Sequence, residues 1–304
     1  MTDHHDCHHQ SSHQHSHHHH GDGNLTWAFA VNVLLSVVQV VGGILSGSLA
    51  LVADALHNLS DAASLLMALI AQKIGRRKPD AKRTYGYKKV ETLSAYTNYV
   101  VLVLISLWLA MEAITRFFSP EPVAGWTVIW IAVLAVGVNL GTVALTYRGA
   151  KESQNVRAAY LHNLGDALSS VGVIIAGVLI VSFDWQWADP LITLIISGYI
   201  LVHVVREIPV VANILIDGNQ DDSLTEKIRS GILSVEGVDG LHHFHVRALD
   251  EHRHAIEAHI VMVEGFNADE LRAKIKKILQ DQYQVDHAFL EIESVDCGER
   301  GCHT

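Results

Sequence analysis

The chain has 304 residues, of which 49% are hydrophobic and only 18% are charged. This composition is too apolar for an ordinary soluble domain. The formal net charge of −10 comes with 21 histidines and says little about partners, and nothing in the sequence suggests nucleic-acid binding. Three cysteines, at positions 7, 297 and 302, are too few and too scattered for a disulfide framework.

Residues 1–24 form a polar tail with ten histidines and one cysteine but no apolar periodicity. Such a composition predicts a disordered cytoplasmic segment that collects metal weakly. The alternative is an expression tag, and the irregular spacing with interspersed Asp and Cys argues against it.

Six long apolar segments follow, and each is long enough for a span of about 20 residues. They cover residues 25–46, 48–74, 90–117, 125–147, 156–182 and 189–213. The first has no basic region before it and no cleavage site, so it is interpreted as a true span and not a signal peptide. Residues 25–216 are therefore predicted to form an all-α bundle of six transmembrane helices.

Basic residues orient this bundle, because Lys and Arg gather in cytoplasmic loops. They cluster after the second and fourth segments, whereas the other connections carry almost none apart from Arg116. The basic positions are Arg76, Arg77, Lys78, Lys82, Arg83, Lys88, Lys89, Arg148, Lys151 and Arg157. Both termini are then cytoplasmic, and the short loops favour a bacterial inner (plasma) membrane.

After residue 216 the chain becomes charged and alternating, as in a soluble domain. Helical periodicity over 223–233 and 268–280, and strand alternation over 240–249, 255–263 and 288–295, predict the order α-β-β-α-β. Residues 217–296 are thus expected to form a small ferredoxin-like or metallochaperone-like α/β domain. Residues 297–304 form a short Cys/His tail.

A seven-residue stretch occurs twice within the apolar segments, as LHNLSDA at 56–62 and LHNLGDA at 161–167. Residues four apart share one face of a helix, so His57 pairs with Asp61 and His162 with Asp166. The two helices run in opposite directions, which lets all four side chains converge at one depth. Two imidazoles and two carboxylates make a tetrahedral set for a divalent metal such as zinc.

Metal needs deprotonated ligands, so metal and protons compete for such a site, and the sequence predicts metal–proton exchange. The alternative is that these polar residues only join helices by hydrogen bonds, and the repetition of the pair argues against it. Asn58 and Asn163 also repeat. Their two possible roles are hydrogen-bond donors that support the metal ligands and residues of helix–helix packing. Asp54 stays open between a proton relay, a vestibule charge and a water-facing residue.

These motifs resemble the cation diffusion facilitator family in its paired HxxxD motifs, in TYGYKKVE at 84–91 and in the α-β-β-α-β tail. The resemblance implies a homodimeric exporter of a divalent metal, usually zinc, exchanged for protons by alternating access. It implies that His57, Asp61, His162 and Asp166 are the transport site. A His in the first position resembles the zinc-preferring branch.

The chain departs from the family pattern in two loops. Some members hold a second metal after the second span with one Asp and two His. Here Asp80 remains, but Arg83 and Tyr87 stand where the histidines would be, so no metal is expected there. Some members have a His-rich loop between spans four and five, and here that loop is short.

The soluble domain carries a second group of candidate ligands. Strand alternation over 241–247 (LHHFHVR) puts His243 and His245 on one face and His242 on the other. The resemblance implies a structural or regulatory Zn²⁺ near the dimer interface, and His242 and His259 match its positions. Glu291, Glu293, Cys297, Cys302 and His303 are further candidates. The alternative is a set of solvated strand histidines.

Four functions compete. The leading one is export of Zn²⁺, and a rival is export with Cd²⁺ or Co²⁺ as the main substrate. An intramembrane metalloenzyme needs an open coordination position and a general base. No HExxH motif is present, and both aspartates are used as ligands, so the chain is not expected to be an enzyme. A metal sensor would need a signalling domain.

Overall fold

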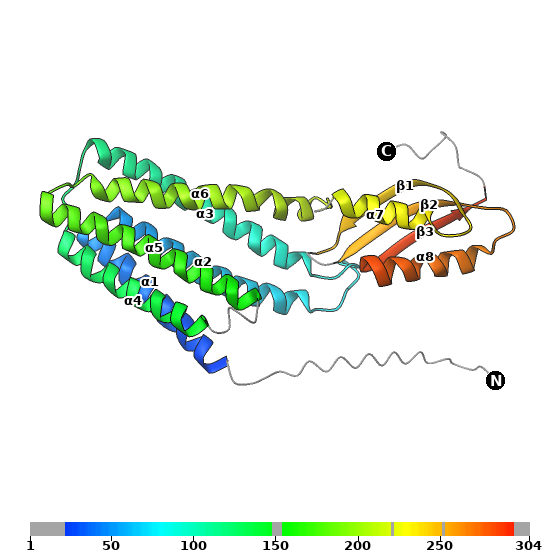
Figure 1. Cartoon of the computed structure of the whole chain (residues 1–304), viewed down its shortest axis with the longest axis horizontal. Coiled ribbons are helices and arrows are strands. Elements are labelled where there is room, and N and C mark those ends of the chain that lie inside the picture. Colours follow the sequence, from blue (N-terminus) through cyan, green and yellow to red (C-terminus); the bar gives the residue numbers. More distant parts are fainter. Residues whose placement is uncertain (1–21, 148–153, 220–221, 251–252, 295–304) are drawn as a thin grey trace.

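The computed structural model describes residues 22–147, 154–219, 222–250 and 253–294. Figure 1 shows a bundle of long helices at one end and a small α/β domain at the other. The long helices are α1 (Asp22–Ser46), α2 (Leu49–Gly75), α3 (Lys89–Phe118), α4 (Gly125–Thr146), α5 (Gln154–Phe183) and α6 (Ala188–Leu215). Their bounds lie within a few residues of the six apolar segments.

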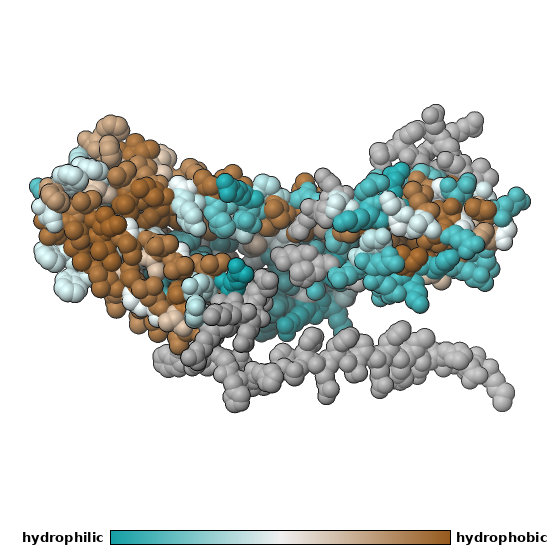
Figure 2. All heavy atoms as spheres, in the orientation of Figure 1, coloured by the Kyte–Doolittle hydropathy of each residue, from teal (hydrophilic) through white to brown (hydrophobic). Residues whose placement is uncertain are grey.

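On the face seen in Figure 2, brown apolar residues cover most of the bundle at the end far from the α/β domain, whereas the α/β domain is mostly hydrophilic. Within the described residues, four helical stretches are long and apolar enough to cross a membrane: Lys89–Phe118, Gly125–Thr146, Tyr160–Phe183 and Ala188–Leu215. The described part of α1 adds a shorter apolar stretch, Ala30–Ser46. The remaining long helix, α2, carries several polar residues. The chain is therefore a membrane protein.

The helices pack in neighbouring pairs, α4 against α5, α3 against α6 and α1 against α2, and α2 also contacts α3, α5 and α6. Two glycines let α4 and α5 approach closely. A Cβ on Gly177 would lie 2.8 Å from the Ile129 side chain and 3.2 Å from the carbonyl oxygen of Gly125. Because α2 and α5 are both held centrally, the two repeated motifs lie inside the bundle.

The start of α2 is fixed by two caps. The Ser48 hydroxyl accepts a hydrogen bond from the Leu51 amide at 3.1 Å, as an N-cap residue does. The fully buried carboxylate of Asp189, at the start of α6, accepts from the Leu49 amide at 2.8 Å and from the Ala50 amide at 3.3 Å. A negative charge is favourable at a helix N-terminus, so Asp189 joins α2 to α6.

The α/β domain comprises α7 (Asp222–Leu233), β1 (Val238–Ala248), β2 (His254–Met262), α8 (Ala268–Tyr283) and β3 (Val285–Glu293). The sheet order is β1-β2-β3, with β1 and β2 antiparallel and β2 and β3 parallel. Its core joins Ile228 of α7 and Ile275 of α8 to Ile256 and Ile260 of β2. Both helices therefore cover the same face of the sheet.

The basic connection before α3 contacts the α/β domain. Lys89 lies 2.5 Å from Asp217, and Lys88 lies 3.9 Å from Asp250. The Tyr85 ring lies 5.5 Å from the His287 ring. These contacts join the domain to the end of the bundle where α2 finishes and α3 begins, as Figure 1 shows.

Candidate metal centre

The two repeated motifs meet inside the bundle. The Nε2 atom of His57 lies 3.6 Å from a carboxylate oxygen of Asp61 and 3.6 Å from one of Asp166. The Nε2 atom of His162 lies 3.3 Å from Asp61 and 3.5 Å from Asp166. Each imidazole of one motif thus faces the carboxylates of both, and the four predicted side chains come together.

The spacing of these atoms suits a tetrahedral zinc ion. With zinc–ligand bonds of about 2.0–2.1 Å, the ligand atoms of a regular tetrahedron lie about 3.3–3.4 Å apart. The four measured N–O distances run from 3.3 to 3.6 Å. Direct hydrogen bonds to an ionised partner are shorter, about 2.7–2.9 Å. Three of the four residues, His57, Asp61 and Asp166, offer ligand atoms that all lie within 4.8 Å of one another, and His162 lies 3.3–3.5 Å from both carboxylates.

Access to the quartet is uneven along the helices. The side chains of His162 and Asp61 are 48% and 29% exposed, whereas those of His57 and Asp166 are 17% and 4% exposed. In α2 and in α5, the more exposed ligand lies on the side of the α/β domain. In each helix the ligand nearer the α/β domain is therefore the more exposed of the pair.

Asp54 lies one turn before His57 and is fully buried, so the water-facing interpretation is wrong. Its Oδ2 atom accepts hydrogen bonds from the Gln39 amide at 2.7 Å and from the Ser170 hydroxyl at 2.8 Å. Sequence reasoning missed both partners. A Gln inside an apolar span is the signal that would have found Gln39, because such residues need a buried partner.

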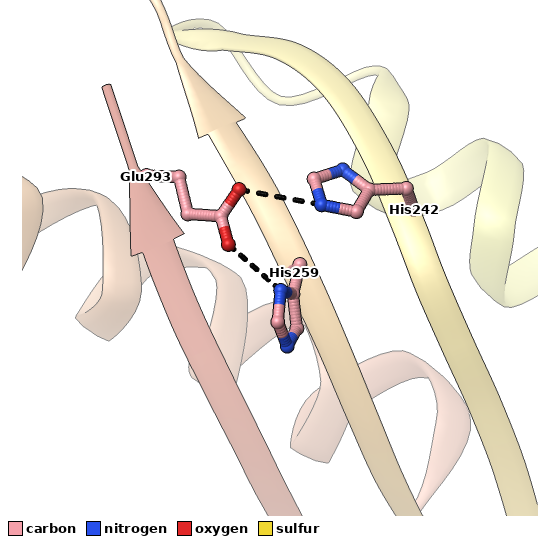
Figure 3. Close-up of side chains that lie close together, drawn as sticks. All are labelled: His242, His259 and Glu293. Atoms are coloured by element: carbon pink, nitrogen blue, oxygen red, sulfur yellow. Dashed lines mark hydrogen bonds and ion pairs between the residues drawn. The ribbon is translucent and has the colours of Figure 1, made fainter. Parts of the chain in front are cut away.

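A second His/carboxylate cluster lies on the sheet, with one residue from each strand (Figure 3). The Nδ1 atom of His259 lies 2.7 Å from Glu293 Oε1, and the Nε2 atom of His242 lies 3.3 Å from Glu293 Oε2. These three residues offer ligand atoms within 4.8 Å of one another. Glu291 lies 3.5 Å from His259 Nε2 on the same strand as Glu293, but it is exposed.

The first strand departs from simple alternation. Its pairing with β2 shifts register between His242 and His245, and His243 has a positive φ of 45°. The His243 ring lies 4.7 Å from the His245 ring and 4.9 Å from the His259 ring. His242 and His243 therefore both face His259, and the expected separation onto opposite faces is wrong because a bulge adds a residue there.

The remaining candidates lie elsewhere. Cys297, Cys302 and His303 fall outside the described residues. Asp80 accepts hydrogen bonds from the backbone amides of Lys82 and Arg83 and from the Tyr87 hydroxyl. The Tyr87 bond contributes most to lowering the pKa of the Asp80 carboxyl. This carboxylate is engaged within its own loop.

Two domains of known proteins match the chain. Residues 25–216 match the cation efflux transmembrane domain, and residues 220–295 match the cytoplasmic domain of cation efflux proteins. Together they cover the bundle and the α/β domain.

Bacterial transporters are similar over nearly the whole length. The zinc transporter ZitB of Escherichia coli (strain K12) is 38% identical over 281 residues, covering 92% of this chain and 90% of the relative. The cadmium, cobalt and zinc/H(+)-K(+) antiporter of Bacillus subtilis (strain 168) is 34% identical, covering 83% and 80%. The metal cation efflux system protein CzcD of Cupriavidus metallidurans (strain CH34) is 33% identical, covering 91% and 89%. This chain therefore belongs to the cation efflux, or cation diffusion facilitator, family.

Proposed function

We propose that this chain is a secondary active exporter that exchanges cytosolic zinc for protons at the quartet of His57, Asp61, His162 and Asp166. The observation that carries the proposal is the convergence of the quartet, in which each imidazole lies 3.3–3.6 Å from both carboxylates and His57, Asp61 and Asp166 offer ligand atoms within 4.8 Å of one another. Two carboxylates balance the 2+ charge. When zinc leaves, protons replace it, because two anions this deep in a membrane are costly.

Export requires that the quartet open to each side in turn. The uneven exposure of the ligands supports a form open toward the α/β domain, from which zinc enters. Closing that side and opening the other would release zinc outside. The Asp189 cap on α2 lies at the opposite end of the bundle, where it joins α6 to the helix that carries His57 and Asp61. This contact is a candidate pivot.

The membrane topology completes the proposal. All six long helices cross the membrane, with α1 and α2 added to the four that are apolar enough by themselves. The basic connection before α3 contacts the α/β domain, which supports a cytoplasmic location for both. The N- and C-termini then lie in the cytosol. The similar proteins are bacterial, which supports the inner membrane as the site of action.

The α/β domain is proposed to bind a structural or regulatory zinc ion and to form a homodimer. His242, His259 and Glu293 supply three ligands from three strands, and zinc takes four. A fourth ligand from the tail, from a partner subunit or from water would complete the site. Since α7 and α8 cover one face of the sheet, the other face is available to a second copy.

Cadmium or cobalt is the second candidate as main substrate. It is favoured by the Bacillus subtilis relative, whose name includes both metals. His/Asp ligand sets bind these ions as well as zinc, so the quartet alone does not choose among them.

Flux through proteoliposomes tests the proposal. Purified chain is reconstituted, and uptake of Zn²⁺, Cd²⁺, Co²⁺ and Mn²⁺ is followed with and without an imposed pH gradient. Net uptake of zinc should occur only when protons move in the opposite direction. An ionophore that collapses the pH gradient should therefore stop net uptake. Zinc flux that ignores the direction of the gradient would contradict proton exchange. Faster uptake of cadmium or cobalt would reassign the substrate.

A further inference from the structure

A line of polar side chains runs through the bundle on the side of α2 that faces α1. Asn32, Ser36 and Gln39 of α1 follow one another at intervals of four and three, so they share one helical face. Ser36 and Gln39 are fully buried. Around them α1 is apolar, and a buried polar stripe in a membrane helix indicates a polar pathway or a polar contact.

The line ends at Asp54. Gln39 donates to the Asp54 carboxylate at 2.7 Å, and the Asn58 amide lies 3.5 Å from the other end of the Gln39 amide. Asp54 uses only its Oδ2 atom in these contacts. Its Oδ1 atom and the Asn58 Oδ1 atom are both buried, and neither has a hydrogen-bond partner among the described residues. The Ser169 hydroxyl of α5 also acts on the Asp54 carboxyl, so the two well-formed hydrogen bonds are at Oδ2 and Oδ1 is the less engaged oxygen.

A fourth helix extends the line toward the α/β domain. Ala124 donates a backbone hydrogen bond to Ser46, so the start of α4 is level with the end of α1. Asn32 lies fourteen residues before Ser46, and Asn139 lies fourteen residues after Gly125. At a rise of about 1.5 Å per residue, each lies about 21 Å along its helix from the level of Ser46 and Ala124, toward the α/β domain. Asn139 is buried, and its two amide atoms have no hydrogen-bond partner among the described residues. Asn32 Oδ1 is likewise buried without a hydrogen-bond partner among the described residues, so unpaired amide atoms of α1 and α4 lie at a similar depth.

We propose that Asp54 is a proton relay, and that the polar line of Gln39, Ser36, Asn32 and Asn139 is a proton path separate from the route of the metal. The proposal rests on zinc–proton exchange at the quartet. Metal reaches the quartet through the exposed side at His162 and Asp61. Protons pass between the quartet and the cytoplasmic end through the line inside α1, α2, α4 and α5. The two ions therefore need not share one passage.

Each transfer conserves charge and atoms. A protonated group of the quartet gives its proton to a bridging water, which passes a proton to Asp54 Oδ1, where an O–H bond forms. Asp54 then gives the proton to a water molecule of the polar line, which carries it away as hydronium. The quartet group becomes free to bind zinc. Among the described residues, Asp166 of α5 is the charged group that acts on Asp54, and His57 and Asp61 follow on its own helix. The described parts of α1 and α4 that line the path contain amide, hydroxyl and apolar side chains only.

Two transport measurements distinguish a role of Asp54 as a proton relay from a role as a metal ligand. Net uptake driven by a pH gradient needs proton movement, whereas exchange of labelled zinc for unlabelled zinc at equal pH needs none. Both are measured with the full chain in proteoliposomes. Asp54→Asn, which keeps the shape but cannot carry a proton, should lower driven uptake by at least about tenfold and leave zinc–zinc exchange close to that of the unchanged protein. Asp54→Glu should restore part of the driven uptake.

Matched controls and a second variant keep the outcomes distinct. Asp189→Asn also removes a buried carboxylate, but at the outer cap of α2, and it should lower both modes together or neither. Asn139→Leu should slow driven uptake alone. If Asp54→Asn shows driven uptake equal to that of the unchanged protein, Asp54 is not a relay. If both modes fail in Asp54→Asn and in Asp54→Glu, the residue serves the conformational change, and the relay is again overturned. Absence of gradient-driven uptake in the unchanged protein would instead overturn zinc–proton exchange itself.

Discussion

The chain holds two clusters of histidine and carboxylate, and they differ in how closely their atoms approach. In the bundle, the N–O distances are 3.3–3.6 Å, so the groups stand apart around a central point. On the sheet, His259 and Glu293 approach to 2.7 Å, the length of a direct hydrogen bond. The sheet cluster thus holds one direct hydrogen bond, although the buried Oε2 atom of Glu293 has no hydrogen-bond partner among the described residues, whereas no His–Asp pair of the bundle quartet approaches that closely.

This difference follows from the elements that carry the groups. Helices α2 and α5 place each His four residues from its Asp. Neighbouring strands bring His242, His259 and Glu293 to one place through the sheet register. An ion at the sheet must replace an existing hydrogen bond. Loss of one ligand should therefore stop the function at the first cluster and only weaken it at the second.

The largest effect is expected for Asp166→Ala. The variant leaves three ligands and one unbalanced charge at the quartet, so zinc affinity should fall by at least about 100-fold and transport should be lost. Zinc flux in proteoliposomes and zinc binding to the purified chain both measure this. The elution profile on size exclusion checks that the variant is folded.

Glu293→Ala, which removes the carboxylate of the other cluster, is the matched control for Asp166→Ala. It should retain a substantial part of the transport rate. Full zinc efflux by Asp166→Ala would refute the assignment of the quartet, whatever the control showed.

A smaller effect is expected when zinc binds the α/β domain, which has its own core. Zinc present at about a hundredfold above its Kd should raise the Tm of a fragment covering residues 217–304 by on the order of 10 °C and shift it toward dimer. Glu293→Gln or His242→Ala should reduce the rise, and His242→Ala in the full chain should lower transport only in part. A fragment indifferent to zinc in melting and in sedimentation would remove the sheet cluster from the list of metal sites.

Much of the architecture was predictable from the sequence, because apolar length and strand alternation are local signals. The six apolar segments and the HxxxD pairs are visible without any contact. The bulge at His243 was not predictable, since a register shift depends on how β1 pairs with β2. The hydrogen bond from Gln39 to Asp54, fifteen residues away on another helix, was not predictable either. Both features depend on which segments of the chain pair with each other in the folded protein.

A modest pH effect is expected at the start of β2, five residues from His259. Burial lowers the pKa of His254, and the nearby Asp250 opposes this only in part. Since the unfolded chain takes up the proton near the ordinary value of about 6.5, the domain should lose stability as the pH falls below that value toward the lowered pKa of the folded state. Above about pH 6.5 this group should contribute no pH dependence.

Melting of the 217–304 fragment between pH 7.5 and 5.5, followed by circular dichroism, measures this loss. His254→Asn should flatten the profile, whereas His245→Asn, a change at an exposed strand histidine, should leave it as it is. The idea fails if His254→Asn keeps the full pH dependence of the unchanged fragment. The comparison separates the half-buried His254 from the partnered His259 in the same strand.

The smallest effect is expected for deletion of residues 1–20. The ten histidines of this segment are expected to raise the local concentration of zinc, so their loss should raise the apparent KM for zinc by less than about tenfold and leave the maximal rate unchanged. Replacing the ten histidines with Asn at constant length separates the loss of ligands from the loss of chain. A fall in maximal rate in both variants would show that the tail acts on transport itself. Because such a tail should only deliver zinc, the effect of its deletion should vanish at a saturating zinc concentration. Asp166→Ala should remain inactive at the same zinc concentration.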